Sequence, residues 1–270
     1  MTLPRLAFTK MHGAGNDFVM IDARALPPGL AIDRARIAAL CDRRRGVGAD
    51  GLILVAEEGP GAIRMTYYNA DGGEAEMCGN GARCTVAFAS AHGLIDAACR
   101  LETFAGPLEG RVHGPQDIEV SLPAYRDLVL DLDLPQAGAP AHACNTGVPH
   151  LVIPGEELET VDVAGQGRRL RNDPAFQPAG TNVNWVAPGP GGTWLLRTYE
   201  RGVEAETLAC GTGASAAAVV LSRLGRAASP VAVRTRGGDL LTITVDHERR
   251  GLRLRGPAVV AFEGEVPCHV

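Results

Sequence analysis

Two cysteines of this 270-residue chain stand in nearly identical surroundings. Cys78 begins the sequence CGNG and Cys210 begins CGTG, and an Ala-rich apolar stretch with helical character follows each of them. Glycine lets backbone N–H groups come close to a ligand, and the N-terminus of a helix favours an anion. That anion can be a thiolate, because a helix N-terminus lowers the pKa of a thiol, or it can be a substrate carboxylate.

A pair of such cysteines suits the inversion of a stereocentre next to a carboxylate. One group must remove a proton from one face of the carbon, and the other must deliver a proton to the opposite face. A thiol and a thiolate can do this near neutral pH, where general acid–base catalysis is most efficient. Aligned N–H groups at two helix starts would stabilise the intervening carbanion. For a single CGxG sequence, a buried packing role is the alternative, and the duplication of the motif weakens that interpretation.

The two motifs belong to an internal repeat. YYNADGGEAEMCGNGARC, from Tyr67, resembles TYERGVEAETLACGTGAS, from Thr198. The two cysteines lie 132 residues apart, and the same offset relates three later positions: Thr103, Gly106 and Leu108 match Thr235, Gly238 and Leu240. A repeat of this length predicts two domains of similar structure.

The remaining sequence is mostly strand-like. Its short segments mostly alternate in polarity or are rich in Val, Ile and Tyr, and they end at Gly, Pro or Asp. The expected strands are 6–10, 18–22, 51–55, 63–68, 118–122, 151–153, 183–186, 195–199, 231–234, 240–245, 252–255 and 258–262. Three helices are expected: Ile32–Arg43, with Asp33 as its N-cap, and the apolar stretches Gly81–His92 and Gly213–Leu224. A helix without a polar face is buried on all sides.

The predicted fold class is therefore α+β. We expect two pseudo-symmetric domains, each a curved, mainly antiparallel sheet wrapped around a central apolar helix. The first domain is placed at 1–123, with 257–270 returning to it as an added strand, and the second at 124–256.

Composition excludes several functional classes. The net charge is −5 and the basic residues are scattered among acidic ones, so no nucleic-acid partner is expected. No apolar stretch is long enough to span a membrane. The seven cysteines form no CxxC pair, which disfavours a disulfide framework, a thiol oxidoreductase and a zinc site. The N-terminal sequence lacks the apolar region of a secretory signal, so a cytoplasmic location is expected.

Six segments of the chain together resemble diaminopimelate epimerase. They are FTKMHGAGNDFVMID (8–22), RRRGVGADGLILV (43–55), YYNADGGEAEMCGNGAR (67–83), GVPH (147–150), TNVNWV (181–186) and YERGVEAETLACGTGA (199–214). They occur in the family's order and cover nearly the whole chain. The resemblance implies a homodimeric isomerase that interconverts L,L- and meso-diaminopimelate on the route to lysine and peptidoglycan. It also implies that neither pyridoxal phosphate nor a metal takes part.

The resemblance assigns roles to individual positions. Cys78 resembles the proton donor and Cys210 the proton acceptor for the L,L substrate. His150 and Glu200 resemble the residues that tune the two thiols. The substrate-binding positions, by side chain or backbone, are Asn16, Asn69, Gly79, Asn80, Asn182, Glu200, Arg201, Gly211 and Thr212. Asparagines can bind ammonium and carboxylate groups, and an arginine can bind a carboxylate through two hydrogen bonds.

Three features depart from the family's pattern. Many members have Gln at the position of Gly51 and Asn at the position of Val148, and both contact substrate in those members. The segment from Glu200 to Cys210 is often one residue shorter. Recognition of the distal end of the substrate therefore stays open.

Alternative functions remain, within the same fold and outside it. A proline racemase or hydroxyproline epimerase would share the fold and the two cysteines, but its first motif usually has His where this chain has Asn80. A phenazine-type isomerase lacks the cysteine pair and fits less well. From a different class, a non-enzymatic protein could bind a carboxylate at the glycine-rich helix starts, although neither motif has the spacing of a P-loop.

Overall fold

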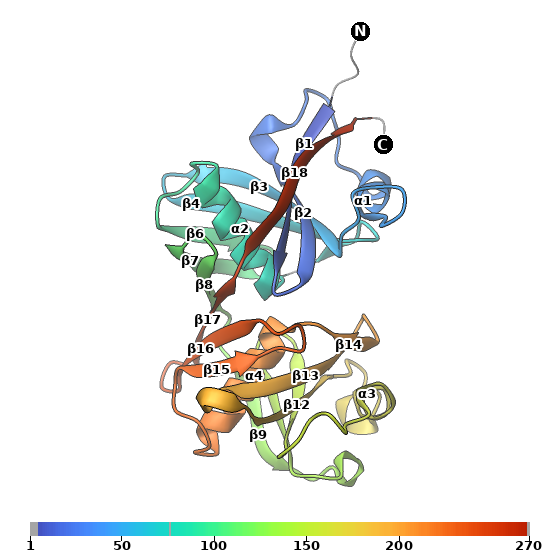
Figure 1. The fold of residues 1–270 in the computed structure, drawn as a ribbon, viewed down its shortest axis with the longest axis vertical. Helices are drawn as coiled ribbons and strands as arrows, with labels where there is room; N and C mark the ends of the chain where they lie inside the picture. Colours follow the sequence, from blue (N-terminus) through green and yellow to red (C-terminus); the bar gives the residue numbers. More distant parts are fainter. Residues whose placement is uncertain (1–4, 76, 269–270) are drawn as a thin grey trace. The chain divides into compact units, whose positions relative to one another are not determined.

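The computed structural model describes residues 5–75 and 77–268 of the chain (Figure 1). The described residues form two compact units. One unit contains those within Met1–Val120 and Pro257–Val270, and the other is Ser121–Gly256. Among the helices of the described residues, none has the length and apolar content that a membrane crossing needs.

The first unit is a mainly antiparallel sheet. Its strands pair in the order β18 (Val259–Pro267), β1 (Arg5–Gly13), β2 (Asn16–Asp22), β3 (Gly51–Gly59), β4 (Ala62–Asn69), β6 (Ala98–Thr103), β7 (Gly106–Gly114) and β8 (Asp117–Leu122). The pairs β2–β3 and β4–β6 are parallel, and the other pairs are antiparallel. The short strand β5 (Glu74–Ala75) pairs with β4.

The second unit repeats this topology. Its strands pair in the order β9 (Arg126–Leu132), β10 (Ala141–Asn145), β11 (Pro149–Pro154), β12 (Asn182–Pro188), β13 (Trp194–Glu200), β15 (Val231–Arg234), β16 (Leu240–Asp246) and β17 (Gly251–Pro257). The parallel pairs, β11–β12 and β13–β15, fall at the same places in the order. The short strand β14 (Ala205–Thr207) pairs with β13 as β5 does with β4. The predicted fold class is confirmed.

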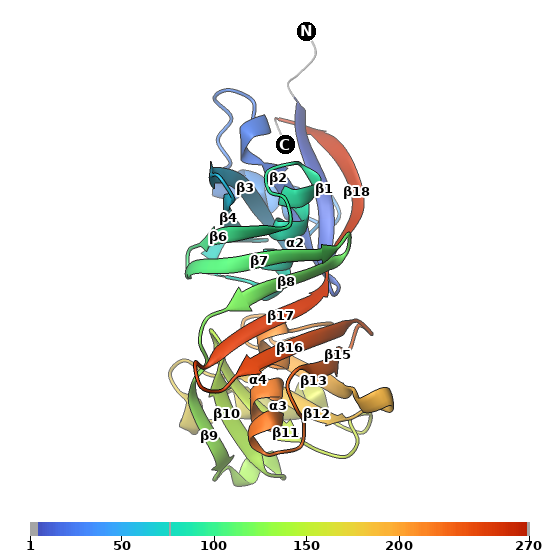
Figure 2. The same cartoon turned by 90° about the vertical axis from the view of Figure 1, so that its left-hand side faces the viewer.

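Each sheet encloses one helix of 13 residues, α2 (Gly79–Ala91) in the first unit and α4 (Gly211–Arg223) in the second. Both are buried on nearly every side, as their sequences predict, because small Ala, Gly, Ser and Thr side chains let strands approach from several directions. Figure 2 shows α2 lying against β6 and β7. At Gly110 of β7, an added Cβ would lie 2.5 Å from Val86 of α2, so only glycine allows this approach.

The structure begins α2 and α4 two residues earlier than predicted, since the first glycine of each motif is already helical. The third predicted helix is α1 (Arg34–Cys41), and Asp33 caps it as expected by accepting a hydrogen bond from the Arg36 backbone N–H. Short 3-10 helices span Ala23–Ala25, Pro135–Ala137, Pro174–Phe176 and Pro190–Gly192.

Several elements were not predicted: β6, β7, β9, β10, the short strands β5 and β14, and the helix α3 (Val163–Arg171). The sequence of α3, VAGQGRRLR, contains two glycines and so has low helix propensity. One local and one tertiary feature explain why it is helical. Asp162 caps its N-terminus by accepting from the Gly165 N–H, and Gly167 lets the helix pack directly on the buried ring of Tyr199, next to Glu200.

Substitution of Gly167 by Ala tests this packing. A Cβ at residue 167 would overlap the Tyr199 side chain. Overpacking of this kind costs about 1–3 kcal/mol, and the gain in helix propensity returns at most ~1 kcal/mol. We expect Gly167→Ala to lower the free energy of unfolding by about 1 kcal/mol in urea titrations. Gly155→Ala is the control, because its Cβ would meet no atom closer than 3.8 Å. Equal stability of the two variants would contradict the close packing of α3.

Candidate active site

Cys78 lies at the N-terminus of α2, beside two of the predicted substrate ligands. Its thiol donates a hydrogen bond to Asn16 Oδ1 at 3.3 Å, and Asn80 Nδ2 donates to the same oxygen at 3.4 Å. Asn16 follows the tight turn between β1 and β2. That turn lies against α2, because a Cβ on Gly13 would come within 2.8 Å of the Asn80 carbonyl oxygen. The structure thus brings Asn16, Cys78 and Asn80 together.

The orientation of the Asn16 amide is fixed by residues that the sequence analysis missed. Asn16 Nδ2 donates to Asp50 Oδ2 at 2.8 Å, and Arg83 Nη2 donates to Asn80 Oδ1 at 2.9 Å. A carboxylate can only accept and a guanidinium can only donate. Asn80 must therefore present its nitrogen to Asn16, and Asn16 must present its oxygen to Cys78. Arg83 is fully buried. It is the charged residue of a helix whose other residues carry no charge, and this contrast could have been noticed in the sequence.

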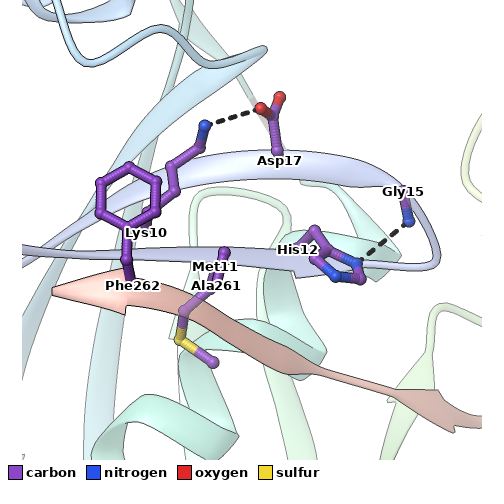
Figure 3. A pocket seen from close by; sticks show the side chains of 7 residues that line it. All are labelled: Lys10, Met11, His12, Gly15, Asp17, Ala261 and Phe262. Atoms are coloured by element: carbon purple, nitrogen blue, oxygen red, sulfur yellow. Dashed lines mark hydrogen bonds and ion pairs between the residues drawn. The ribbon is translucent and has the colours of Figure 1, made fainter.

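A cluster of charged side chains holds Asp50 in place. Arg43 Nη2 bonds both Asp50 Oδ1 and Asp17 Oδ1 at 2.7 Å, and Lys10 Nζ lies 2.8 Å from Asp17 Oδ2. Figure 3 shows Lys10 and Asp17 directed toward each other in a recess that Met11, His12, Gly15, Ala261 and Phe262 also line. Burial alone would raise the pKa of the Asp17 carboxyl, but hydrogen bonds from Arg43 and Lys10 outweigh it and hold this pKa well below its usual value.

In the second unit, Cys210 occupies the position at α4 that Cys78 occupies at α2. Both residues have extended backbone angles, φ −137° and ψ 119° at Cys78 and φ −124° and ψ 106° at Cys210. Cys210 Sγ lies 3.5 Å from Thr212 Oγ1, and either atom can donate. The hydroxyl of Thr146 donates to the Thr212 carbonyl at 2.8 Å, which anchors the first turn of α4.

Four other predicted site residues lie on β11, β12 and β13 or directly after them. His150 of β11 is opposite Asn182 of β12 in the parallel register. Asn182 Oδ1 accepts from the Arg201 backbone N–H at 2.8 Å, and the Arg201 guanidinium donates to the Ala179 carbonyl at 2.9 Å. Glu200, the last residue of β13, accepts from the Thr207 hydroxyl at 2.9 Å. The structure therefore places His150, Asn182 and Arg201 at neighbouring strand ends.

His150 is a neutral imidazole in this structure. It is 1% exposed, and burial lowers its pKa to about 3, with a further contribution from the positive charge of Arg201. The ring therefore carries no charge at any pH near neutrality. The Nδ1 atom of His150 faces the Nδ2 atom of Asn184 at 3.1 Å. Asn184 was not among the site residues predicted from the sequence.

The remaining predicted residues lie at the starts of the two central helices and at the end of β4. The first two residues of α2 are Gly79 and Asn80, and those of α4 are Gly211 and Thr212. The backbone N–H groups at the start of a helix have no carbonyl acceptor within that helix, so they can bind a ligand. Asn69 ends β4, opposite Gly51 of β3, and its side chain is held by the Tyr67 hydroxyl at 3.0 Å. Among the described residues, no group of three or more His, Cys, Asp or Glu side chains is arranged to hold a metal ion.

Comparison with known proteins agrees with the motifs. The family model described as "Diaminopimelate epimerase" matches residues 8–123 and 142–261. The chain belongs to the diaminopimelate epimerase family. It is 42% identical to diaminopimelate epimerase of Gemmatimonas aurantiaca, over 97% of this chain and 99% of that protein. It is 40% identical to diaminopimelate epimerase of Aquifex aeolicus, over 97% and 98%. The predicted family membership is confirmed.

A solved structure shares the fold at lower sequence similarity. The phenazine biosynthesis protein of the PhzF family from Bacillus anthracis superposes with a TM-score of 0.72 at 16% identity, over 98% of this chain and 99% of that one. At this identity the likeness concerns the fold alone. It agrees with the two-unit α+β architecture that members of this epimerase family are expected to have.

The charged cluster around Asp17 predicts how stability depends on pH. Because the pKa of Asp17 is lowered in the folded state, its contribution is complete above the unfolded-state value of about 3.9 and is lost as the pH falls below it. Asp17→Asn removes that contribution, and the half-buried pair suggests a loss of about 2 kcal/mol at pH 7. The difference from the unsubstituted protein should shrink as the pH falls below ~3.9, because the carboxyl of the unfolded chain then becomes protonated.

Urea titration at pH 7 and at about pH 3 checks this prediction. Asp71→Asn is the control, since Asp71 forms an exposed ion pair with Arg34. A stability difference for Asp17→Asn that stayed constant over this pH range would mean that the carboxylate is not held by Lys10 and Arg43.

Proposed function

We propose that the protein inverts the α-carbon of L,L-diaminopimelate to give meso-diaminopimelate, a precursor of lysine and peptidoglycan. The reaction uses Cys78 and Cys210 as acid and base and needs neither pyridoxal phosphate nor a metal. One observation carries the proposal. The N-cap positions of the two equivalent, enclosed helices are cysteines, and each is followed by the glycine that begins its helix.

The contrast with the other helices supports this role. The N-termini of α1 and α3 are capped by the side chains of Asp33 and Asp162. At α2 and α4, the side chain at the same position is a thiol, and the N–H groups of Gly79 and Gly211 begin a buried helix. The positive end of the helix dipole then favours an anion at these two places. A substrate carboxylate, the enediolate formed from it, and a thiolate are anions of the required kind.

The hydrogen bonds suggest which cysteine carries the proton in the resting enzyme. Asn16 presents an acceptor oxygen to Cys78, so Cys78 fits as the thiol. Cys210 has the Thr212 hydroxyl as its neighbour, and a hydroxyl can donate to a thiolate. This agrees with Cys78 as proton donor and Cys210 as proton acceptor for the L,L substrate.

The proposed reaction then has two proton transfers. The Cys210 thiolate removes the α-proton, and the electron pair of the broken C–H bond moves into the carboxylate to form an enediolate. The Cys78 thiol donates its proton to the opposite face, which forms the new C–H bond and inverts the centre. The enzyme is left with a Cys210 thiol and a Cys78 thiolate, which is the form that accepts a proton from the meso isomer.

The other predicted residues take binding or tuning roles in this proposal. Asn16, Asn69, Asn80, Asn182 and Arg201 bind the ammonium and carboxylate groups of the substrate, together with the first N–H groups of the two helices. His150 and Glu200 adjust the protonation of the two thiols. This chain has Gly51 and Val148 where many family members have Gln and Asn. In this proposal the remaining side chains therefore bind the distal end of the substrate.

A homodimer in the cytoplasm is part of the same proposal. It rests on the resemblance of the chain to its family. Light scattering coupled to size exclusion tests the dimer, since a mass equal to one 28.2 kDa chain would contradict it.

Epimerase assays of cysteine variants test the reaction. The purified protein, treated with a chelator and given no cofactor, should convert L,L-diaminopimelate to the meso isomer, as chiral chromatography would show. Cys78→Ala and Cys210→Ala should each lower kcat by about 10²–10⁴-fold, the range for loss of a general acid or base. Cys268→Ala is the matched control, because Cys268 lies outside both motifs. Turnover of proline or hydroxyproline instead would overturn the substrate, and inactivity toward every amino acid would favour a carboxylate-binding protein.

Substitution of Asp50 tests whether the orientation of the Asn16 amide matters. In Asp50→Asn, residue 50 can donate as well as accept, so the Asn16 amide is free to turn its nitrogen toward Cys78. We expect kcat to fall about tenfold, which corresponds to one hydrogen bond, with a smaller change in KM. Asp71→Asn, which also removes an exposed aspartate paired with an arginine, should leave kcat unchanged. An Asp50→Asn enzyme with normal kcat and normal thermal stability would show that Asp50 does not act through Asn16.

A further inference from the structure

Asn184 is a buried side chain whose amide orientation is unambiguous. It lies on β12 and is 0% exposed. Its Nδ2 donates to the Leu151 carbonyl at 2.9 Å, and its Oδ1 accepts from the Thr198 hydroxyl at 3.0 Å. A backbone carbonyl can only accept, so the atom that faces it must be the amide nitrogen. The second hydrogen of that nitrogen is directed at His150 Nδ1, 3.1 Å away.

This orientation determines the tautomer of His150. Since Asn184 Nδ2 is a donor, His150 Nδ1 must be the acceptor and cannot carry a proton. The ring is neutral, because burial lowers the pKa of His150 to about 3. A neutral imidazole has a single ring proton, and that proton must be on Nε2.

The Nε2–H group of His150 has no hydrogen-bond partner among the residues that the structure describes, and the atom is buried. An unsatisfied buried donor costs about 1–3 kcal/mol, so its retention needs a reason. The same Asn184 lies against the second cysteine motif: a Cβ on Gly213 would overlap Asn184 Oδ1 and would lie 3.3 Å from Cys210 Sγ. Asn184, and with it His150, therefore lies next to the second cysteine motif of the candidate site.

We infer that Asn184 is a positioning residue that holds His150 in its Nε2–H tautomer, so that His150 donates a hydrogen bond to an anion in the site. The anion is either the Cys210 thiolate or a carboxylate of the substrate, two acceptors with the same hydrogen-bond chemistry. This inference rests on the proposed function for its purpose. It differs from proton transfer by His150, since a ring with its proton on Nε2 and Nδ1 occupied has no free basic nitrogen.

The tautomer itself can be measured without any activity. In protein labelled with [15N]histidine, two-bond 1H–15N correlation spectra distinguish protonated from unprotonated ring nitrogens. His150, assigned by the loss of its signals in His150→Gln, should show a proton on Nε2 alone between pH 5 and pH 9. In Asn184→Asp, a carboxylate replaces the donor, so the proton should move to Nδ1 or both nitrogens should be protonated. An Nδ1–H tautomer in the unsubstituted protein would overturn the inference even if the enzyme were fully active.

The acceptor is identified by the same signal. If the acceptor is the Cys210 thiolate, Cys210→Ala shifts the Nε2–H resonance in the absence of any ligand. If the acceptor is a substrate carboxylate, the resonance shifts when meso-diaminopimelate is added to the inactive Cys210→Ala protein. A resonance that moves in neither case would show that His150 does not donate to an anion in the site.

Two substitutions of His150 separate its roles in kinetics. The amide nitrogen of Gln can occupy the place of Nε2, whereas the shorter Asn reaches only the place of Nδ1. We expect His150→Gln to retain about tenfold more kcat than His150→Asn, a difference of one hydrogen bond, with thermal unfolding as the check that both fold. Equal kcat values in two folded variants would contradict a donor role for Nε2.

Discussion

The two central helices are enclosed by their sheets, and most of their side chains are small or apolar. A helix buried on nearly every side has no exposed face for polar residues, and α2 and α4 consist mainly of Gly, Ala, Ser, Thr and apolar residues. The buried Arg83 of α2 donates hydrogen bonds to the Gly79 carbonyl and to Asn80 Oδ1. The same constraint places glycines at the helix starts, where backbone N–H groups are accessible to a ligand. A cysteine at each N-cap is then held by the backbone at the positive end of a helix. Both candidate catalytic groups depend on this packing.

Around each cysteine, groups that can only donate or only accept determine the direction of the hydrogen bonds. In the first unit, Asp50 and Arg83 orient the amides of Asn16 and Asn80, so that an oxygen faces Cys78. In the second unit, the Leu151 carbonyl orients the amide of Asn184, so that a nitrogen faces His150. The repeat therefore preserves the positions of the cysteines, while their hydrogen-bonding neighbours differ: an amide oxygen at Cys78 and a hydroxyl at Cys210.

Much of this arrangement could be predicted from the sequence. The repeated Cys-Gly-polar-Gly motif, the apolar stretches after it and the cap at Asp33 are local signals, and they indicated the central helices and the fold class. Strands β6 and β7 were missed although inward-facing and outward-facing residues alternate in both, a signal that could have been used. The helix α3 was missed because its stability depends on contact with Tyr199. Asp50 and Asn184 form hydrogen bonds with residues distant in sequence. Asn182 and Asn184 lie on one face of the same strand, which was a signal that could have been used.

The central claim is that two different thiols serve the two faces of one α-carbon. The most direct test follows solvent deuterium at low conversion of L,L-diaminopimelate in D2O, by mass spectrometry of the separated isomers. If one cysteine removes the proton and the other supplies a solvent-derived one, early meso product carries a single deuterium at the inverted centre. The remaining L,L substrate keeps its protium. Product that retains the original proton, or deuterium that enters the substrate as fast as the product, would contradict the account and indicate a single base.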